Sequence, residues 1–114
     1  MSVPKEIQDH MSELQELCNR YHVRSLYLFG SAAKGEMKPT SDYDFLVDIP
    51  LVQENFEAYA NSYFEMADSL ERMLNRKVDL LTLPMLTNPY LIQSIDNSKV
   101  QLYFSSANDS NSIN

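Results

Sequence analysis

The sequence predicts a small α/β domain in which about four short strands form a sheet and helices pack on it. Two long stretches carry apolar residues at three- and four-residue steps, which is the spacing of an amphipathic helix. Four shorter apolar runs are bounded by residues typical of turns. With 114 residues, 44% of them hydrophobic, the chain has room for one domain with a modest core. We expect this domain to span residues 1–104 and the Ser- and Asn-rich residues 105–114 to form a disordered tail.

The first helix is predicted to begin near Pro4, because proline favours the first turn of a helix. Its apolar stripe consists of Ile7, Met11, Leu14, Leu17 or Cys18, and Tyr21. A longer helix between the second and third strands carries a second stripe, formed by Phe56, Tyr59, Ala60, Tyr63, Met66 or Ala67, Leu70, and Met73 or Leu74. Stripes at this spacing usually face the core of a protein rather than a cofactor. The aromatic arc that includes Phe56 and Phe64 is wide enough to leave part of its surface for a partner.

The first strand is predicted at Ser25–Phe29, a run rich in strand formers. It ends at Gly30, where the chain can turn without a Cβ atom. Ser31 comes next, and Ala32–Lys34 favours a short helix. The first amides of that helix and the Ser31 hydroxyl would therefore face a ligand above the strand end, with Lys34 adding a positive charge. The turn is predicted to hold a phosphate-sized anion.

The second strand is predicted at Tyr43–Ile49, with Asp42 and Asp44 at its start. Side chains alternate between the faces of a strand, so these two carboxylates share one face. Two like charges side by side are unfavourable unless a cation or a proton lies between them. Mg²⁺ prefers oxygen ligands and commonly combines carboxylates with substrate phosphates. The turn and the acid pair together predict one ligand, a metal-bound polyphosphate.

A third acid, Asp79, lies inside the predicted strand Val78–Thr82. If this strand lies beside the second one, Asp79 completes a three-carboxylate site of the kind that holds two metal ions during displacement at phosphorus. The alternative is an edge-strand aspartate that simply faces water. Asn88 and Pro89 then indicate the start of a short helix, and a last strand follows at residues 99–104.

These residues resemble the minimal nucleotidyltransferases of the DNA polymerase beta superfamily. The resemblance rests on Gly30-Ser31, the ten-residue spacing to Asp42-Tyr43-Asp44, and the later strand Asp79, and it extends over roughly residues 7–104. It implies a polymerase-beta-like core with a mixed sheet. It also implies that Gly30 and Ser31 bind the triphosphate of ATP and that the two acids of the pair hold Mg²⁺.

In this family Asp79 corresponds to the third metal ligand or to the base for the acceptor hydroxyl. An arginine is common where this chain has Lys34, which keeps the charge but loses the bidentate phosphate geometry. Small members of the family are typically cytoplasmic antitoxins paired with a HEPN-domain ribonuclease toxin. The resemblance therefore implies transfer of AMP from ATP to a toxin hydroxyl, most typically that of a tyrosine.

Two other functions are compatible with these residues. The chain can neutralise a toxin by binding alone and retain the three acids for stability or for nucleotide sensing. It can also be an antibiotic nucleotidyltransferase, although those enzymes usually carry an added helical domain for which we expect no room here.

Composition narrows the class of partner and the compartment. A formal charge of −7 and a pI near 4.6 disfavour direct binding of nucleic acid and favour a basic protein partner. No apolar run approaches the roughly 20 residues of a membrane helix. Cys18 is the single cysteine, which is consistent with a reducing compartment. We therefore expect a cytoplasmic protein that does not contact the membrane.

Overall fold

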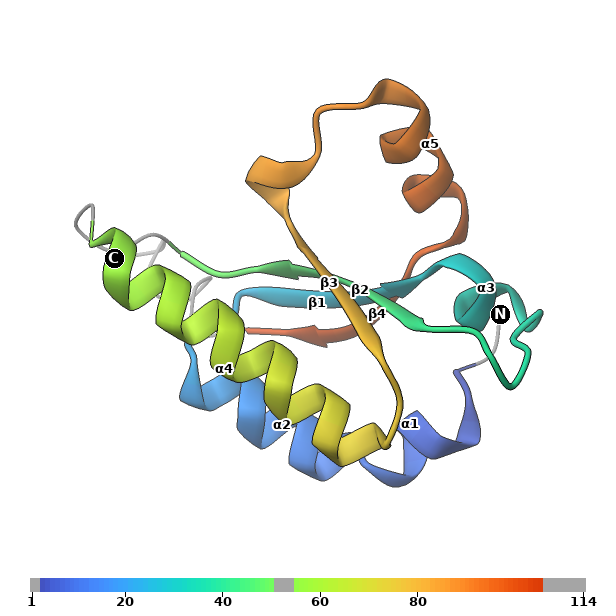
Figure 1. The fold of residues 1–114 in the computed structure, drawn as a ribbon, viewed down its shortest axis with the longest axis horizontal. Coiled ribbons are helices and arrows are strands. Elements are labelled where there is room, and N and C mark those ends of the chain that lie inside the picture. The colour runs from blue at the N-terminus through green and yellow to red at the C-terminus, as the bar shows by residue number, and fades with distance from the viewer. Residues whose placement is uncertain (1–2, 51–54, 106–114) are drawn as a thin grey trace.

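Four strands form one mixed sheet in the computed structural model, which describes residues 3–50 and 55–105 (Figure 1). The strands are β1 (Ser25–Phe29), β2 (Tyr43–Asp48), β3 (Val78–Thr82) and β4 (Val100–Phe104). Their order across the sheet is β3-β2-β1-β4. β1 is antiparallel to both of its neighbours, whereas β2 and β3 are parallel. The predicted mixed sheet is confirmed, and the condition set for Asp79, that the third strand lies beside the second, is met.

Helices cover the two faces of this sheet unequally. The helices are α1 (Lys5–Asp9), α2 (Met11–Arg20), α3 (Gly30–Lys34), α4 (Phe56–Leu74), the short 3₁₀ helix η1 (Leu83–Met85) and α5 (Pro89–Ser98). Figure 1 shows α1, α2 and α4 on one side of the sheet and α5 on the other. None of the helices within the described residues is long and apolar enough to cross a membrane.

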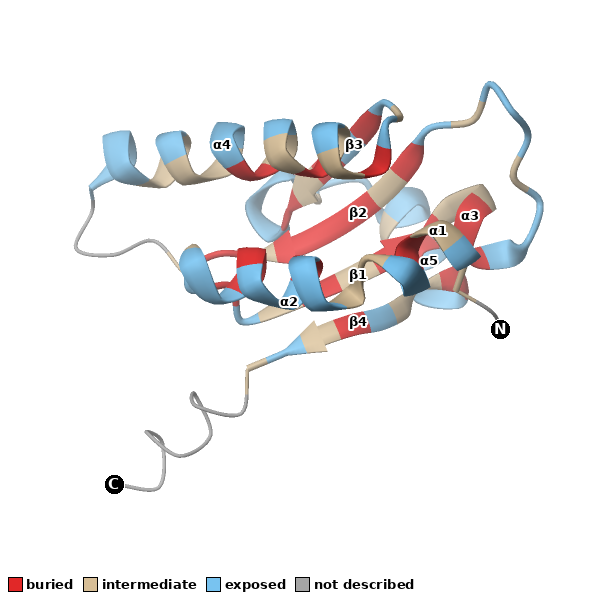
Figure 2. Cartoon of the chain, turned by 90° about the horizontal axis from the view of Figure 1, so that it is seen from below, coloured by how far each residue is buried: buried red, intermediate tan, exposed pale blue. Residues whose placement is uncertain are grey.

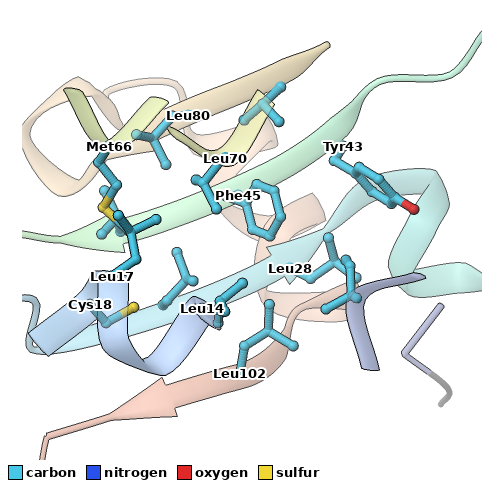
Figure 3. Close-up of a cluster of buried hydrophobic side chains, with 14 of the residues drawn as sticks. Leu14, Leu17, Cys18, Leu28, Tyr43, Phe45, Met66, Leu70, Leu80 and Leu102 are labelled. Atoms are coloured by element: carbon cyan, nitrogen blue, oxygen red, sulfur yellow. The ribbon is translucent and has the colours of Figure 1, made fainter. Parts of the chain in front are cut away.

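The main core lies between the sheet and the layer of α1, α2 and α4 (Figure 3). It is built from alternate residues of each strand, because successive side chains point to opposite faces. Leu28 and Phe45 on the sheet and Leu70 on α4 are fully buried there. Figure 2 shows the outward sides of α2 and α4 exposed, as their amphipathic stripes require.

The opposite face of the sheet is covered more thinly. Phe29, Leu46 and Ile95 form a small separate cluster there, with Ile95 contributed by α5. Because α5 covers only part of this face, polar side chains at the start of β2 and β3 stay accessible. Two of the acids predicted to bind metal, Asp44 and Asp79, lie on this face, and Asp42 directly precedes β2.

The outer edge of β3 is held by α4. Tyr63 on α4 donates a hydrogen bond to the Leu80 carbonyl oxygen at 2.6 Å, and the backbone N–H of Val78 donates to the Glu71 carboxylate at 3.1 Å. Edge strands expose unpaired backbone groups, so these two contacts satisfy groups that would otherwise face water or another chain. They also fix the position of Asp79, which lies between Val78 and Leu80.

The predicted first helix is divided into α1 and α2 at His10. Its backbone adopts φ −111° and ψ 16°, and its ring nitrogen Nδ1 lies 2.7 Å from the Glu6 carbonyl oxygen. The imidazole thus competes for a carbonyl that would otherwise serve the helix ladder. The apolar stripe survives the break, since Ile7 and Leu14 are both buried.

The structure differs from two further expectations at the ends of strands. The second strand ends at Asp48 rather than Ile49. The last strand begins at Val100 rather than at residue 99, and its pairing with β1 shifts register between Leu26 and Tyr27. Of the predicted tail, Ser105 is described and residues 106–114 lie outside the described residues.

Candidate active site

The predicted anion-binding turn follows β1 directly. Gly30 has φ +73° and Gly35 has φ +75°, so both ends of α3 use the left-handed conformation that glycine adopts without strain. Ala32 and Ala33 are buried and fasten α3 to the main core. Ser31 stays half-buried at the start of the turn.

Gly30 lies directly against the Asp44 carboxylate. Phe29, the residue before the turn, pairs with Asp44 across the antiparallel β1–β2 ladder. A Cβ atom built on Gly30 would overlap the Asp44 Oδ2 atom. Glycine is therefore required at this position for two reasons, its positive φ angle and the close approach of the acid. The Gly-Ser turn therefore lies against Asp44, one member of the acid pair that follows it after ten residues in the sequence.

Asp79 lies beside Asp44 on the neighbouring strand. The parallel pairing of β2 and β3 sets the two residues opposite each other in register. Burial raises the pKa of the Asp44 carboxyl from its ordinary 3.8 to about 6, with further contributions from the charges of Asp79 and then Asp42. All three influences disfavour the ionised form. The charges of Asp79 and Asp42 thus reach the Asp44 carboxyl, which is the unfavourable like-charge arrangement that a bound cation relieves.

Both interpretations of Asp79, as a site residue and as an edge-strand residue facing water, agree in part with the structure. β3 is an edge strand and Asp79 is exposed, as the simpler interpretation holds. It nevertheless lies next to Asp44, as the site interpretation requires. Exposure at the edge leaves its carboxylate accessible to a ligand above the sheet.

The loop that leads into Asp42 is held by Arg76. The Arg76 guanidinium donates hydrogen bonds to the Pro39 and Ser41 carbonyl oxygens at 3.0 and 2.9 Å, and it lies over the Tyr43 ring at 5.4 Å from the centroid. The ring is fixed in turn, because the Tyr43 hydroxyl donates to the Glu6 carboxylate at 2.7 Å. Burial, followed by this hydrogen bond, raises the pKa of Tyr43 to about 12. Arg76 thus positions the loop that leads to the acids.

Lys34 remains a predicted phosphate-binding residue. It is exposed at the end of α3, and no ion pair joins it to another of the described residues. Cys18 is buried in the main core, where burial raises the pKa of its thiol to about 12. Its expected role as a small core residue is confirmed.

The sequence does not predict that two further residues, Tyr63 and Ser98, lie near the site. The pKa of the Tyr63 hydroxyl is raised by burial and then by the charge of Asp79, which places this α4 side chain near the cluster. Ser98, the last residue of α5, is buried and accepts a hydrogen bond from the Gly30 backbone N–H at 3.3 Å. Tyr63 belongs to a stripe that predicts core packing only, and no local pattern marks Ser98.

The donor set suits a hard cation that takes part of its coordination from a substrate. No group of three or more His, Cys, Asp or Glu side chains within the described ranges is arranged to hold a metal ion by itself. The half-buried Asp44, with its raised pKa and the adjacent Asp79, instead offers paired carboxylate oxygens. Mg²⁺ commonly binds one or two carboxylates together with substrate phosphates, so the residues present are compatible with it. The set of three ligands, Asp42, Asp44 and Asp79, stays a prediction.

A glycine-serine turn against paired strand carboxylates, on a mixed sheet with helices packed on it, defines a nucleotidyltransferase core. The chain belongs to the nucleotidyltransferase domain family, whose sequence profile matches residues 11–102.

Relatives and a solved structure support this assignment. A predicted protein adenylyltransferase of Methanocaldococcus jannaschii is 34% identical over 97 residues, covering 84% of this chain and 94% of the relative. The protein adenylyltransferase MntA of Thermococcus cleftensis is 36% identical over 72 residues, covering 63% of this chain and 65% of the relative. This chain shares its fold with a chain in the solved structure of a tri-AMPylated Shewanella oneidensis HEPN toxin in complex with MNT antitoxin. The TM-score is 0.58 at 23% identity, and the match covers 90% of this chain and 76% of the chain in the complex.

Proposed function

We propose that this protein is a Mg²⁺-dependent protein adenylyltransferase that transfers AMP from ATP to a hydroxyl, most simply that of a tyrosine, on a cognate HEPN ribonuclease toxin. Transfer would neutralise the toxin, so the chain acts as an antitoxin. The observation that carries the proposal is the contact between Gly30 and the Asp44 carboxylate, with Asp79 in register beside it. This arrangement would bring the phosphates of the nucleotide next to the cation that accompanies them.

In the proposed reaction the acceptor hydroxyl oxygen attacks the α-phosphorus of ATP. A new oxygen–phosphorus bond forms, the bond between the α-phosphorus and the bridging oxygen to the β-phosphate breaks, and pyrophosphate leaves. The Gly30-Ser31 turn would bind the triphosphate through the Ser31 hydroxyl and the amides that follow it, because the Gly30 N–H already donates to Ser98. Lys34 would reach the triphosphate only if ligand binding draws its exposed side chain inward. Asp79 would either take the hydroxyl proton or serve as a ligand to the metal.

Asp42, Asp44 and Asp79 would hold the ion, and two ions are expected if all three acids participate. When bound, Mg²⁺ supplies charge neutralisation at the phosphates and lowers the pKa of the attacking oxygen. The raised pKa of Asp44 supports this role, because a cation would offset both the burial of the ionised carboxylate, which is the largest cause, and the charges of Asp79 and Asp42.

Three observations support a protein partner. The relatives named as protein adenylyltransferases modify proteins by that name, and the solved complex contains an AMPylated HEPN toxin. On α4, Phe56 is 69% exposed and Phe64 is 67% exposed, which is typical of a surface that binds another protein. The formal charge of −7 disfavours nucleic acid as acceptor. A reaction that uses ATP and a ribonuclease toxin belongs in the cytoplasm.

The test is intact-mass spectrometry of the cognate HEPN protein after incubation with this chain, ATP and Mg²⁺. We expect a mass gain of one or more AMP units, which disappears with EDTA and with the double variant Asp42→Asn/Asp44→Asn. Asp48→Asn is the matched control, because it makes the same change further along β2, and it should retain transfer. A tight complex with no mass gain from any of the four nucleoside triphosphates would overturn the proposal in favour of neutralisation by binding alone.

A further inference from the structure

Ser98 connects the end of α5 to the site turn. Ser98 is only 4% exposed, and its Oγ atom has two hydrogen-bond partners. The hydroxyl donates to the Ser94 carbonyl oxygen at 3.2 Å and accepts from the Gly30 backbone N–H at 3.3 Å. Both the donor and the acceptor capacity of this buried hydroxyl are therefore used.

The first of these contacts is ordinary, and the second is not. A serine inside a helix often donates to the carbonyl four residues earlier, which satisfies it without any wider role. The bond from Gly30 comes from a residue 68 positions away in the chain. Gly30 is also the residue whose backbone lies against the Asp44 carboxylate. The hydroxyl thus holds the backbone on which the geometry of the site depends.

This contact also determines which amides can meet a ligand. The N–H of Gly30 is committed to Ser98 and is not available to a phosphate. Its commitment helps to hold the positive φ angle of Gly30, from which the direction of Ser31 follows. On the same helix Ile95 packs against Phe29 and Leu46, so α5 secures the strand end through an apolar contact as well as a polar one.

We propose that Ser98 is a positioning residue for the transfer site, which acts by fixing the Gly30-Ser31 turn against Asp44 through the hydrogen bond from the Gly30 amide. Its kinetic consequence rests on the proposed function, whereas the hydrogen bond itself does not. Without the hydroxyl, the turn gains freedom, Ser31 loses its fixed direction, and the distance between turn and acid varies.

The structural half of the proposal is tested by amide hydrogen exchange in protein labelled with ¹⁵N-glycine. The chain contains two glycines, so the spectrum separates Gly30 from Gly35, and the Gly35 amide serves as an internal reference. In the wild type we expect a protected Gly30 amide. In Ser98→Ala its exchange should accelerate about tenfold, as expected for a lost hydrogen bond to a buried group, while the exchange of Gly35 stays unchanged. Ser94→Ala keeps the carbonyl acceptor on the same helix and should leave both amides as they are.

The kinetic half is tested by AMP transfer to the HEPN partner at varied ATP concentration. Ser98→Ala should raise the KM for ATP about fivefold or more, a change of the size that one hydrogen bond contributes. Leu70→Ala is a control for stability alone. Assayed below its unfolding temperature, it should change the amount of active protein without changing KM. Ser98→Cys keeps a side chain of similar size with a weak acceptor, so it should give a smaller rise in KM. It also serves as the second variant if Ser98→Ala does not fold.

The outcomes separate the two claims. A rapidly exchanging Gly30 amide in the wild type, or equal protection in Ser98→Ala, overturns the proposed role of Ser98 whatever the activity. Normal transfer by Ser98→Ala with an unchanged KM also overturns it and leaves the proposed function standing. Absence of transfer by the wild type would instead refute the proposed function, while the exchange result would still decide whether Ser98 holds the turn.

Discussion

Replacement of Asp44 by asparagine should stabilise the metal-free protein while it abolishes AMP transfer. The pKa of this carboxyl rises from its ordinary 3.8 to about 6 on folding, owing to burial and then to the charges of Asp79 and Asp42. Each tenfold change in proton affinity corresponds to about 1.4 kcal/mol, so the ionised carboxylate costs at most about 3 kcal/mol of folding free energy. Asp44 is half-buried, and screening by solvent reduces this to on the order of 1–2 kcal/mol.

The pH dependence of this gain has a definite sign. Because the folded pKa lies above the unfolded one, the folded protein binds the proton more tightly than the unfolded chain does. The contribution of Asp44 to stability therefore falls as pH rises from about 4 to about 6. Below this window Asp44 is protonated in both states, and asparagine should make little difference. Above it the full benefit of asparagine should appear.

The assay is urea unfolding in EDTA at pH 4 and pH 7.5, with Asp48→Asn as the matched control on the same strand. We expect Asp44→Asn to raise the free energy of unfolding by about 1–2 kcal/mol at pH 7.5 and by much less at pH 4. Asp48→Asn should show no such gain. A loss of stability at pH 7.5, or an equal gain at both pH values, would refute the raised pKa that we infer for Asp44.

Three further predictions concern the turn and the core. Gly35→Ala should cost about 1–2 kcal/mol through its positive φ angle alone, whereas Gly30→Ala should cost more and abolish transfer, because its new methyl group also overlaps the Asp44 carboxylate. Equal losses in urea unfolding would argue against that overlap. Leu70→Ala should destabilise the fold by about 2–5 kcal/mol, since the side chain is fully buried, and a loss well below this range would argue against full burial of Leu70. Cys18 should react with a thiol reagent only after unfolding, because burial raises its pKa to about 12, and rapid labelling of the native protein would contradict its place in the core.

Local patterns in the sequence predict most of the secondary structure and part of the site. Ser25–Phe29 and Phe56–Leu74 occur with the bounds that their apolar spacing predicts. The place of Asp44 on the site face of β2 follows from the alternation of side chains along a strand, whereas Asp42 precedes that strand and its shared face stays a prediction. These features depend on neighbours within a few residues, which a single sequence contains. The break at His10 is also local, but it comes from a ring nitrogen competing for a carbonyl, which apolar periodicity does not register.

The features that assemble the site depend on contacts between distant segments. Asp79 lies next to Asp44 only because β3 pairs in parallel with β2. The sequence alone does not determine which strands pair, so the neighbourhood of Asp79 could be stated only as a condition. The approach of Gly30 to Asp44 depends on the register of β1 against β2. Ser98 meets Gly30 across 68 residues. Arg76, likewise, holds its loop through backbone carbonyls, which no side-chain pattern reveals.

The central claim is that the Gly30-Ser31 turn and the Asp44–Asp79 pair form one site for a metal-bound nucleotide. A crystal structure of this protein with a nonhydrolysable ATP analogue and Mg²⁺ tests it most directly. We predict the triphosphate beside Ser31 and the ion bound by Asp44 and Asp79, with Asp42 as the third expected ligand. A nucleotide bound elsewhere, such as in the apolar groove of about 570 Å³ that Phe56 and Met85 line at the other end of β2, with neither acid in contact with the ion, would contradict the account.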